Sequence, residues 1–349
     1  MKTIVLTGGG TAGHCIPNVA LLPYLKKNFN NIVYIGSKNG IEKSIISKHK
    51  IKYHQITTVK FHRGKIIKNL SIPIKLLQGI RQAKTILKKV KPSVVFSKGG
   101  FVSVPVVIAS KMLKIPVISH ESDLTIGLAN KINSKYCKLI LTTFPETAKQ
   151  IKNGRHVGPP LKNEIFNCNK NECLKKFGFD GKKPVLLVTG GSQGALAIND
   201  CIRQSLSRLT PIFDVLHLCG KNNLANINVN GYKQIEYIEN MEEAMSVASI
   251  CVSRAGSNTI FELLSLKIPT LLIPLPSNAS RGDQLLNAKY FYDKGLVNML
   301  LQDNLTPDTL INSILTTYKN AQSYKVSLQQ YPVTNSCEQI AKILTENSN

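Results

Sequence analysis

The sequence predicts an α/β protein built from two doubly wound parallel-sheet domains. Short apolar runs alternate with segments whose apolar residues recur at helical spacing, which is typical of repeated strand–helix units. Glycine-rich turns follow several of these runs, as expected where a buried strand leads directly into a helix. The alternation breaks at residues 158–161 (Gly-Pro-Pro-Leu) and then begins again. Because 349 residues suffice for two domains of ordinary size, we place the domain boundary there.

The two predicted domains, residues 1–161 and 162–330, differ in charge; a final helix within residues 331–349 is expected to pack back on the first. Residues 1–162 carry 28 Lys or Arg and four Asp or Glu, whereas residues 163–349 carry 17 and 16. A composition rich in Lys throughout would not make only one half basic. The first domain is therefore expected to meet an anionic partner, either nucleic acid or anionic lipid.

Other features of the sequence narrow the class of protein. No run of 18 uncharged apolar residues appears, so no span of a bilayer is predicted. The first seven residues predict a strand rather than a cleaved signal peptide. The eight cysteines are scattered without a zinc-site or disulfide pattern, which fits a reducing cytoplasm.

The first strand, residues 4–6, leads into the glycine loop from Gly8 to His14 and then into a helix from residue 17 to residue 27. The spacing is not that of a dinucleotide loop, and no acidic residue closes the next strand, residues 32–35. A dinucleotide-binding loop does not need a histidine. The ordinary pKa of histidine lies near neutrality, so His14 is suited to act as a general base. The alternative is a histidine that only bonds a nearby carbonyl.

Further strands are predicted at residues 52–56, 93–96, 115–118, 139–141 and 155–157. Ligands of doubly wound sheets bind at the carboxyl ends of the strands. The first loop, the second glycine turn at residues 98–101 and the segment 120–123 are therefore expected to converge.

A basic helix is predicted between residues 69 and 90. Such a helix often packs on a sheet with its lysines in water, but with Ile66 and Ile67 just ahead it could also lie on an anionic membrane. The candidate membrane residues are Ile66, Ile67, Lys68, Lys75, Leu76, Arg81 and Lys84.

The second half repeats the pattern, with strands predicted at residues 184–188, 215–218, 234–238, 250–252 and 270–274. A third glycine loop, residues 190–195, and a turn at residues 253–257 each precede a helix, whose first N–H groups can bind an anion. Glu262, farther along the second of these helices, could accept hydrogen bonds from ribose hydroxyls; the alternative is a surface glutamate. Two such halves facing across a cleft would suit transfer between two substrates with water excluded.

The glycine loops and the other conspicuous sequence blocks, taken in their order along the chain, resemble those of the GT-B glycosyltransferases. Residues 8–14 resemble the first glycine loop of that family (GGTxGH), residues 98–101 the second and residues 190–195 the third (GGSQGA). The remaining blocks are His120-Glu121 with Asn130-Lys131, Arg254 to Glu262, and Asp283-Gln284 with Asn287-Ala288. The resemblance implies GT-B architecture and an inverting transferase. Its reaction would move N-acetylglucosamine from UDP-GlcNAc to undecaprenyl-pyrophosphoryl-MurNAc-pentapeptide (lipid I), giving lipid II for peptidoglycan.

The same resemblance implies a role for each matching position. The catalytic candidates are His14 and, second, Glu121. The donor-binding candidates are Thr11, Ala12, Gly13, Asp123, Lys162, Ser192, Gln193, Ile238, Arg254, Ser257, Asn258, Thr259, Glu262, Asp283, Gln284 and Asn287, and the acceptor-binding candidates are Gly99, Gly100 and Phe101. Ile238 would contact uracil through its backbone, residues 257–259 would cradle the phosphates with Ser192, and Gln284 and Asn287 would hold the sugar. Arg254 would help to stabilise the leaving UDP.

The resemblance further implies that no metal is bound, that UDP-GlcNAc is a substrate rather than a cofactor, and that the protein works on the cytoplasmic face of the cell membrane. Asp123 and Lys162 stand where the family often has Asn and Arg, and Lys lacks the bidentate fork of Arg. The alternatives are a diacylglycerol glycosyltransferase, a UDP-GlcNAc 2-epimerase and a nucleic-acid-binding protein. The lack of Trp and the 6% aromatic content count against the last of these.

Overall fold

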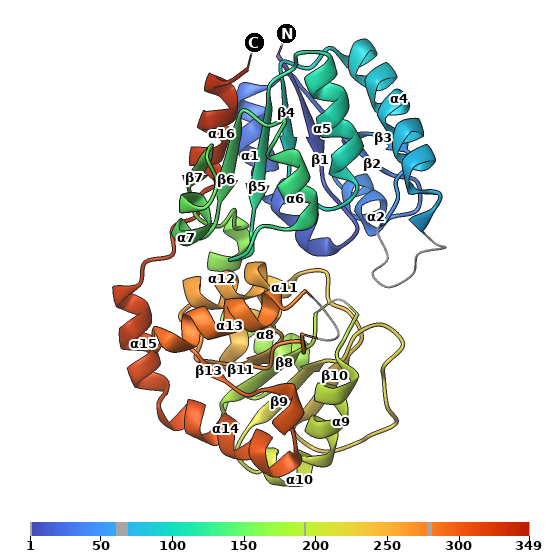
Figure 1. Cartoon of the computed structure of the whole chain (residues 1–349). Coiled ribbons are helices and arrows are strands. Elements are labelled where there is room, and N and C mark those ends of the chain that lie inside the picture. The colour runs from blue at the N-terminus through green and yellow to red at the C-terminus, as the bar shows by residue number, and fades with distance from the viewer. Residues whose placement is uncertain (1, 61–68, 192, 278–280, 349) are drawn as a thin grey trace. The chain divides into compact units, whose positions relative to one another are not determined.

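The structure is a computed structural model and describes residues 2–60, 69–191, 193–277 and 281–348. The chain forms two compact units (Figure 1). Unit 1 comprises residues 1–162 and 335–349, and unit 2 comprises residues 163–334. The chain therefore leaves unit 1 after Lys162 and returns to it at Asn335.

Unit 1 is built on a seven-stranded sheet in which every neighbouring pair of strands is parallel. Its strands are β1 (Thr3–Thr7), β2 (Asn31–Ser37), β3 (Lys52–Ile56), β4 (Val94–Ser97), β5 (Val117–Glu121), β6 (Leu139–Thr142) and β7 (Gly154–His156). The spatial order is β3-β2-β1-β4-β5-β6-β7. Each strand that we predicted in this half is present.

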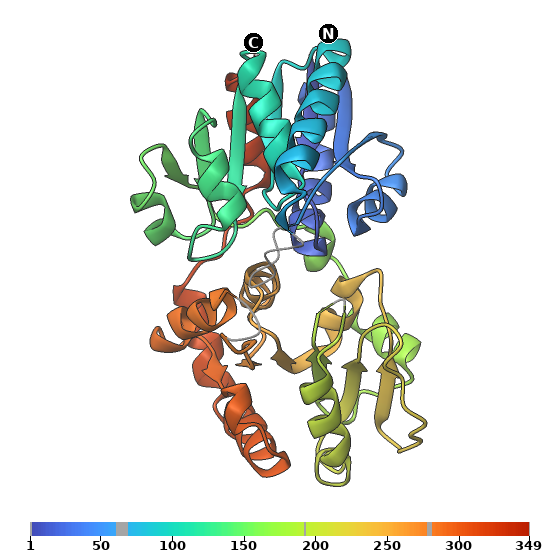
Figure 2. The same ribbon diagram turned by 45° about the vertical axis from the view of Figure 1, so that its right-hand side comes forward.

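Helices cover both faces of this sheet, and the side chains of β1 show why. Ile4 and Leu6 join one buried cluster, while Val5 joins the cluster on the other face. The helices and short 3₁₀ turn of unit 1 are η1 (Ala12–His14), α1 (Ile16–Asn28), α2 (Ile41–Ser47), α4 (Ile72–Val90), α5 (Ser103–Met112), α6 (Leu128–Asn133), α7 (Pro145–Lys149) and α16 (Cys337–Glu346). The long helix α4 packs against α5 (Figure 2).

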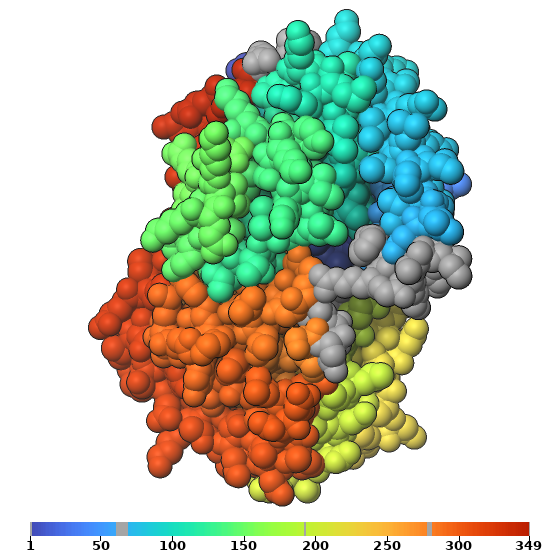
Figure 3. Space-filling view, in the orientation of Figure 1, coloured from blue at the N-terminus to red at the C-terminus, as the bar shows by residue number. Residues whose placement is uncertain are grey.

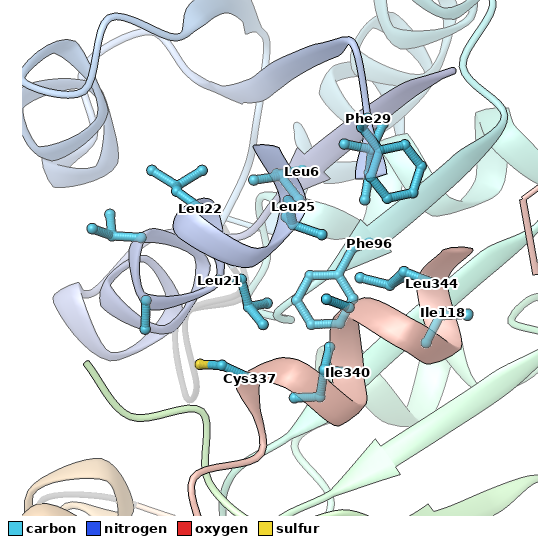
Figure 4. Close-up of a cluster of buried hydrophobic side chains, with 14 of the residues drawn as sticks. Leu6, Leu21, Leu22, Leu25, Phe29, Phe96, Ile118, Cys337, Ile340 and Leu344 are labelled. Atoms are coloured by element: carbon cyan, nitrogen blue, oxygen red, sulfur yellow. The ribbon is translucent and has the colours of Figure 1, made fainter. Parts of the chain in front are cut away.

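The last helix, α16, belongs to unit 1 although it follows all of unit 2 in the sequence. Cys337, Ile340 and Leu344 form a fully buried stripe at helical spacing and pack with Leu21 and Phe96 (Figure 4). The chain segments that leave and re-enter unit 1 are also hydrogen-bonded to each other. Asn335 accepts from the Leu161 N–H at 3.1 Å and donates to the Leu161 carbonyl at 2.8 Å.

Unit 2 contains a six-stranded sheet that is also parallel throughout. Its strands are β8 (Val185–Thr189), β9 (Asp214–Leu218), β10 (Tyr232–Ile235), β11 (Ala248–Ser253), β12 (Thr270–Leu272) and β13 (Asn298–Met299), in the order β10-β9-β8-β11-β12-β13. The two-residue strand β13 was not predicted. Together the two sheets confirm the predicted fold class of two doubly wound parallel-sheet domains.

The helices of unit 2 enclose its sheet between two buried apolar clusters. They are η2 (Asn163–Phe166), α8 (Lys170–Phe177), α9 (Leu196–Gln204), α10 (Leu206–Leu209), α11 (Met241–Val247), α12 (Ser257–Ser265), α13 (Asp283–Asp293), η3 (Gln302–Asn304), α14 (Pro307–Lys319) and α15 (Ala321–Gln330). Across the described residues of both units, no helix combines the length and apolar character needed to cross a bilayer. All eight cysteines are free thiols.

Candidate active site

Each sheet has one point where the strand order reverses, and the predicted site residues gather there. In unit 1 the reversal lies between β1 and β4, which lead into the first and second glycine loops. In unit 2 it lies between β8 and β11, which lead into the third glycine loop and the turn before α12. Crevices of this kind are where doubly wound sheets bind ligands. The structure therefore brings the candidate residues into two groups, one in each unit.

The first glycine loop presents Thr11 and His14 at the surface of unit 1. The Thr11 hydroxyl lies 2.9 Å from Nδ1 of His14, a contact that orients the imidazole ring. Thr11 is exposed and His14 is half-buried. Behind the loop, the Tyr34 hydroxyl donates to the Gly8 carbonyl at 2.8 Å, and Asn18 donates to the His14 carbonyl at 3.5 Å.

The second glycine loop lies directly against the first. Gly99 and Gly100 have φ values of +84° and +76°, a region that glycine adopts more readily than other residues. A Cβ atom on Gly100 would lie 2.2 Å from the carbonyl oxygen of Gly9. A Cβ on Gly10 would lie 2.4 Å from Cε1 of Phe101. The close approach of the two loops therefore depends on glycine at both positions.

Glu121, at the end of β5, is buried and accepts four hydrogen bonds. Oε1 accepts from the N–H groups of Ser122 and Asp123, at 2.9 and 3.1 Å. Oε2 accepts from the Gly127 N–H and from Nδ2 of Asn130, both at 2.9 Å. With its lone pairs used in this way, the carboxylate organises the turn between β5 and α6. Asp123 lies half-buried in that turn.

Two buried residues beside Glu121 were not singled out as site residues from the sequence. Lys98 is 1% exposed and donates to the Ser122 hydroxyl. Burial lowers the pKa of the Lys98 ammonium to about 8, although the nearby carboxylates of Glu121 and Asp123 oppose this shift. His120 is fully buried, and burial, followed by the charge of Lys98, holds its pKa well below the usual range.

In unit 2 the third glycine loop joins β8 to α9. Gly191 and Gly194 have φ values of +82° and +75°, and the Gly194 N–H donates to the Gly191 carbonyl at 2.9 Å. Gln193 is exposed, and its carbonyl accepts from Nδ2 of Asn223 at 3.3 Å. The candidate phosphate contact Ser192 lies outside the described residues.

Residues 254–256 connect β11 to α12, and residues 257–262 lie within that helix. The helix begins at Ser257, so the backbone N–H groups of Ser257, Asn258 and Thr259 belong to its first turn. Glu262 lies on the same helix and is half-buried. Arg254 points elsewhere: its guanidinium donates to the carbonyls of Ile273 and Pro274, at 3.1 and 3.2 Å, and to Gln302 at 2.5 Å.

The remaining donor candidates are held in unit 2 or at its edge. Oε1 of Gln284 accepts from the Leu275 N–H at 3.0 Å. Asn287 is fully buried and reaches the Ala255 carbonyl at 3.4 Å, which ties α13 to the turn before α12. Asp283, in the first turn of α13, pairs with Arg281. Ile238 and Lys162 are both half-buried, and Lys162 stands at the boundary of unit 1.

The described residues contain no group of three or more His, Cys, Asp and Glu side chains placed to hold a metal ion.

The candidate membrane residues of α4 differ in exposure. Lys75 and Arg81 are exposed, whereas Leu76 and Lys84 are half-buried. Ile74 and Leu77 are instead 73% and 49% exposed. Ile66, Ile67 and Lys68 lie outside the described residues.

Comparisons with known proteins agree with this arrangement. The glycosyltransferase family 28 N-terminal domain matches residues 4–142, and the family 28 C-terminal domain matches residues 185–343. A Clostridium botulinum protein is 46% identical over 99% of this chain and 99% of its own length. A Clostridium tetani protein is 45% identical over 98% of this chain and 97% of its own. Both are named UDP-N-acetylglucosamine–N-acetylmuramyl-(pentapeptide) pyrophosphoryl-undecaprenol N-acetylglucosamine transferase.

Solved structures give the same result. The crystal structure of Acinetobacter baumannii MurG matches with a TM-score of 0.77 and 25% identity, covering 99% of this chain and 100% of that one. A UDP-GlcNAc 2-epimerase from Neisseria meningitidis, at 14% identity and a TM-score of 0.68, shares the fold. The two parallel-sheet domains and their glycine loops define a glycosyltransferase of the GT-B class. Within that class, the chain belongs to glycosyltransferase family 28.

Proposed function

We propose that this enzyme transfers N-acetylglucosamine from UDP-GlcNAc to the polyprenyl-linked acceptor named in its relatives, N-acetylmuramyl-(pentapeptide) pyrophosphoryl-undecaprenol, for peptidoglycan synthesis. The observation that carries the proposal is the identity of about 46% over nearly the whole chain to transferases of that name. The two groups of site residues support it, since one unit offers a polar surface with a candidate base and the other offers two anion-binding turns.

The donor is proposed to bind unit 2. The first-turn N–H groups of α12, from Ser257 to Thr259, and the third glycine loop would hold the two phosphates. Glu262 would accept from the ribose hydroxyls, and the backbone of Ile238 would meet the uracil ring. Gln284 and Asn287 would contact the sugar. Because Arg254 is bonded to two backbone carbonyls, we assign it to supporting the α12 turn and not to direct contact with the departing UDP.

The acceptor is proposed to bind unit 1 at the two adjoining glycine loops, with Gly99, Gly100 and Phe101 facing it. His14 is the proposed general base, because it lies in the glycine loop, is only half-buried and has its ring oriented by Thr11. As the acceptor hydroxyl attacks the anomeric carbon, its proton passes to the imidazole and the bond to UDP breaks with inversion. Glu121 is less suited to this task because four donors already occupy its carboxylate.

The negative charge that develops on UDP would be stabilised by backbone N–H groups at helix starts, and we propose that no resident metal is needed. Groups that are fixed in place before the reaction begins stabilise such charge without reorganisation, typically by about 3–4 kcal/mol per donor.

Unit 1 is proposed to dock on the cytoplasmic face of the cell membrane through α4. Ile74, Leu77 and Arg81 share one face of this helix, and both apolar side chains are well exposed. The surface of α4 can be followed along one edge of unit 1 in Figure 3. Apolar side chains flanked by basic ones are typical of helices that enter an anionic headgroup layer.

A turnover assay tests the proposed reaction. The purified enzyme is given UDP-GlcNAc with a lipid I analogue or with diacylglycerol, and the products are separated. We expect a disaccharide-linked lipid from the first acceptor only. Glycosylated diacylglycerol, or formation of UDP-N-acetylmannosamine or free N-acetylmannosamine without any acceptor, would contradict the proposal in favour of the other two enzyme classes.

Docking is tested by sedimentation with phosphatidylglycerol vesicles at low and high salt. Changing Ile74 and Leu77 to Ser should abolish the binding that remains at high salt, and changing Lys75 and Arg81 to Gln should weaken binding at low salt. Met112, an exposed apolar residue on α5, serves for comparison when it alone is changed to Ser. Unchanged binding by both double variants would exclude α4 as the docking surface.

A further inference from the structure

A buried carboxylate holds the first glycine loop from behind. Glu42 lies in the first turn of α2, 32 residues beyond Gly10, and its side chain is fully buried. Oε2 accepts from the Gly10 N–H at 3.2 Å, and Oε1 accepts from the Ser37 N–H at 3.0 Å and from the Ser37 hydroxyl. One carboxylate therefore joins the end of β2 to the middle of the glycine loop.

The surrounding backbone is shaped to admit this carboxylate. A Cβ atom on Gly9 would lie 2.6 Å from the carboxyl carbon of Glu42, and one on Gly40 would lie 2.3 Å from both of its oxygens. Gly9 and Gly40 both have ordinary backbone conformations, since neither is among the positive-φ glycines. The space taken by the Glu42 carboxylate is thus a reason for glycine at both positions.

The contact acts where the loop turns toward its exposed part. Gly10 has a φ of +90° and immediately precedes Thr11, whose hydroxyl orients His14. Two carbonyls of the loop are bonded to neutral groups, that of Gly8 to Tyr34 and that of His14 to Asn18. Glu42 supplies a charge-assisted hydrogen bond at the peptide between these two ties, and such bonds are stronger than neutral ones.

We propose that Glu42 is a positioning residue for glycosyl transfer: its carboxylate fixes the Gly10 peptide and so holds Thr11 and His14 in the orientation needed for proton removal. Glu42 touches neither substrate, and its role acts through the loop. The inference rests on the proposed function of His14, but the tether itself can be measured without any turnover.

The test variant is Glu42→Gln, which keeps the size of the side chain. An amide has only one acceptor oxygen. If that oxygen stays with Ser37, the NH₂ group faces the Gly10 N–H, and two donors oppose each other. The matched control is Tyr53→Phe. The Tyr53 hydroxyl donates to the Ser37 carbonyl at 2.6 Å, so its loss weakens the same corner of unit 1 without touching the glycine loop.

Steady-state kinetics, amide hydrogen exchange and melting temperature are measured on the full chain. For Glu42→Gln we expect kcat to fall 10- to 100-fold while KM for UDP-GlcNAc stays within about twofold. We also expect faster amide hydrogen exchange in peptides covering residues 8–15, with exchange in unit 2 unchanged. Tyr53→Phe should lower the melting temperature no more than Glu42→Gln does. It should leave kcat and hydrogen exchange in the glycine loop near the parent values.

The following results would overturn the proposal. Unchanged exchange in the loop would mean that Glu42 does not tether Gly10. Faster exchange with an unchanged kcat would mean that the tether does not serve transfer. Equal losses of kcat in both variants would reduce Glu42 to a purely structural role. If His14→Ala leaves kcat intact, the proposed base is wrong, and that result is separate from the exchange measurement.

Discussion

Residues 8–14 of unit 1 and residues 190–195 of unit 2 both follow the first strand of their sheet and precede a helix at the switch point. Their sequences, GGGTAGH and GGSQGA, are closely similar. Their supports are not. The first loop is tied by side chains: Glu42 binds the Gly10 N–H, and Tyr34 and Asn18 bind two carbonyls of the loop.

In its described part the third loop has two side-chain ties, from Nδ2 of Asn223 to the Gln193 carbonyl at 3.3 Å and from the Gly191 N–H to the Thr189 hydroxyl at 3.4 Å, and it also packs closely against backbone. A Cβ atom on Gly194 would lie 2.0 Å from the Cys219 carbonyl oxygen, and one on Gly220 would lie 2.3 Å from the Gly194 nitrogen. The same carbonyl of Cys219 accepts from Nδ2 of Asn199 at 2.8 Å. Oδ1 of Asn199 in turn lies 3.0 Å from Nε2 of His217.

The difference follows from what each loop is proposed to do. A loop that only offers N–H groups to phosphates needs a fixed backbone, and contacts between glycines and carbonyls provide that. A loop that carries a general base must also fix the direction of a side chain, which requires directional hydrogen bonds on both sides of it. We therefore expect changes in the first loop to act on kcat and changes in the third to act on donor binding and stability.

The largest expected effect is that of His14→Ala. Removing the base should lower kcat by about 10² to 10⁴ with little change in KM for UDP-GlcNAc, because the donor is proposed to bind unit 2. His156→Ala is the control, since the ring of that histidine bonds a backbone carbonyl, that of Thr143, at 3.2 Å. Steady-state kinetics decide the matter. A kcat for His14→Ala within a few-fold of the parent value would mean that His14, like His156, is not the general base.

Glu262→Ala should show the opposite pattern. Losing a carboxylate that accepts from two ribose hydroxyls costs about 2–4 kcal/mol, since each hydrogen bond to a charged group contributes about 1.5–3. KM for UDP-GlcNAc, and the dissociation constant of UDP measured by calorimetry, should therefore rise by more than tenfold. Glu172→Ala, on the exposed first turn of α8, should change neither. Unchanged UDP affinity in Glu262→Ala would remove this residue from the donor site.

A pair of glycine substitutions tests the packing of the third loop. Gly191 and Gly194 both have positive φ, so alanine costs about 1 kcal/mol at either position through backbone strain alone. At Gly191 the added Cβ meets nothing within 4 Å, whereas at Gly194 it meets the Cys219 carbonyl. Thermal unfolding should show Gly194→Ala to be less stable than Gly191→Ala by about 2 kcal/mol. Equal stabilities would mean that close packing does not hold this loop.

Much of this comparison could be predicted from the sequence, because strands and glycine turns leave local signals. The apolar runs and the loops after them appeared as predicted. The supports did not, because hydrogen-bond partners leave no local pattern: Glu42, which binds the Gly10 N–H, lies 32 residues farther along the chain on a helix that gave no distinct signal. The sequence also did not predict which apolar residues of α4 face the solvent. Composition predicted an apolar, basic helix, but only its packing against α5 decides that Ile74 and Leu77, rather than Leu76, are exposed.

The smallest expected effect concerns pH and the support of the third loop. Burial, followed by the charge of Arg203, lowers the pKa of His217 from 6.5 to about 3. The neutral ring bridges Asn199 and the Tyr232 hydroxyl, which lies 2.9 Å from Nδ1. The unfolded chain takes up this proton below pH 6.5 and the folded chain does not. The stability contributed by neutral His217 is therefore complete above pH 6.5 and is lost as the pH falls toward 3.

Replacing His217 with Gln removes this titration. The parent protein should be more stable than His217→Gln at pH 7.5, and the difference should shrink by about 1–2 kcal/mol between pH 6.5 and pH 5, since one pKa unit corresponds to about 1.36 kcal/mol. Tyr232→Phe deletes a hydrogen bond of the same ring but leaves the titrating group, so its stability difference from the parent should stay constant over that range. Melting temperatures measured across the pH series provide the comparison. A difference that remains constant for His217→Gln as well would mean that the support of the third loop does not depend on a neutral histidine.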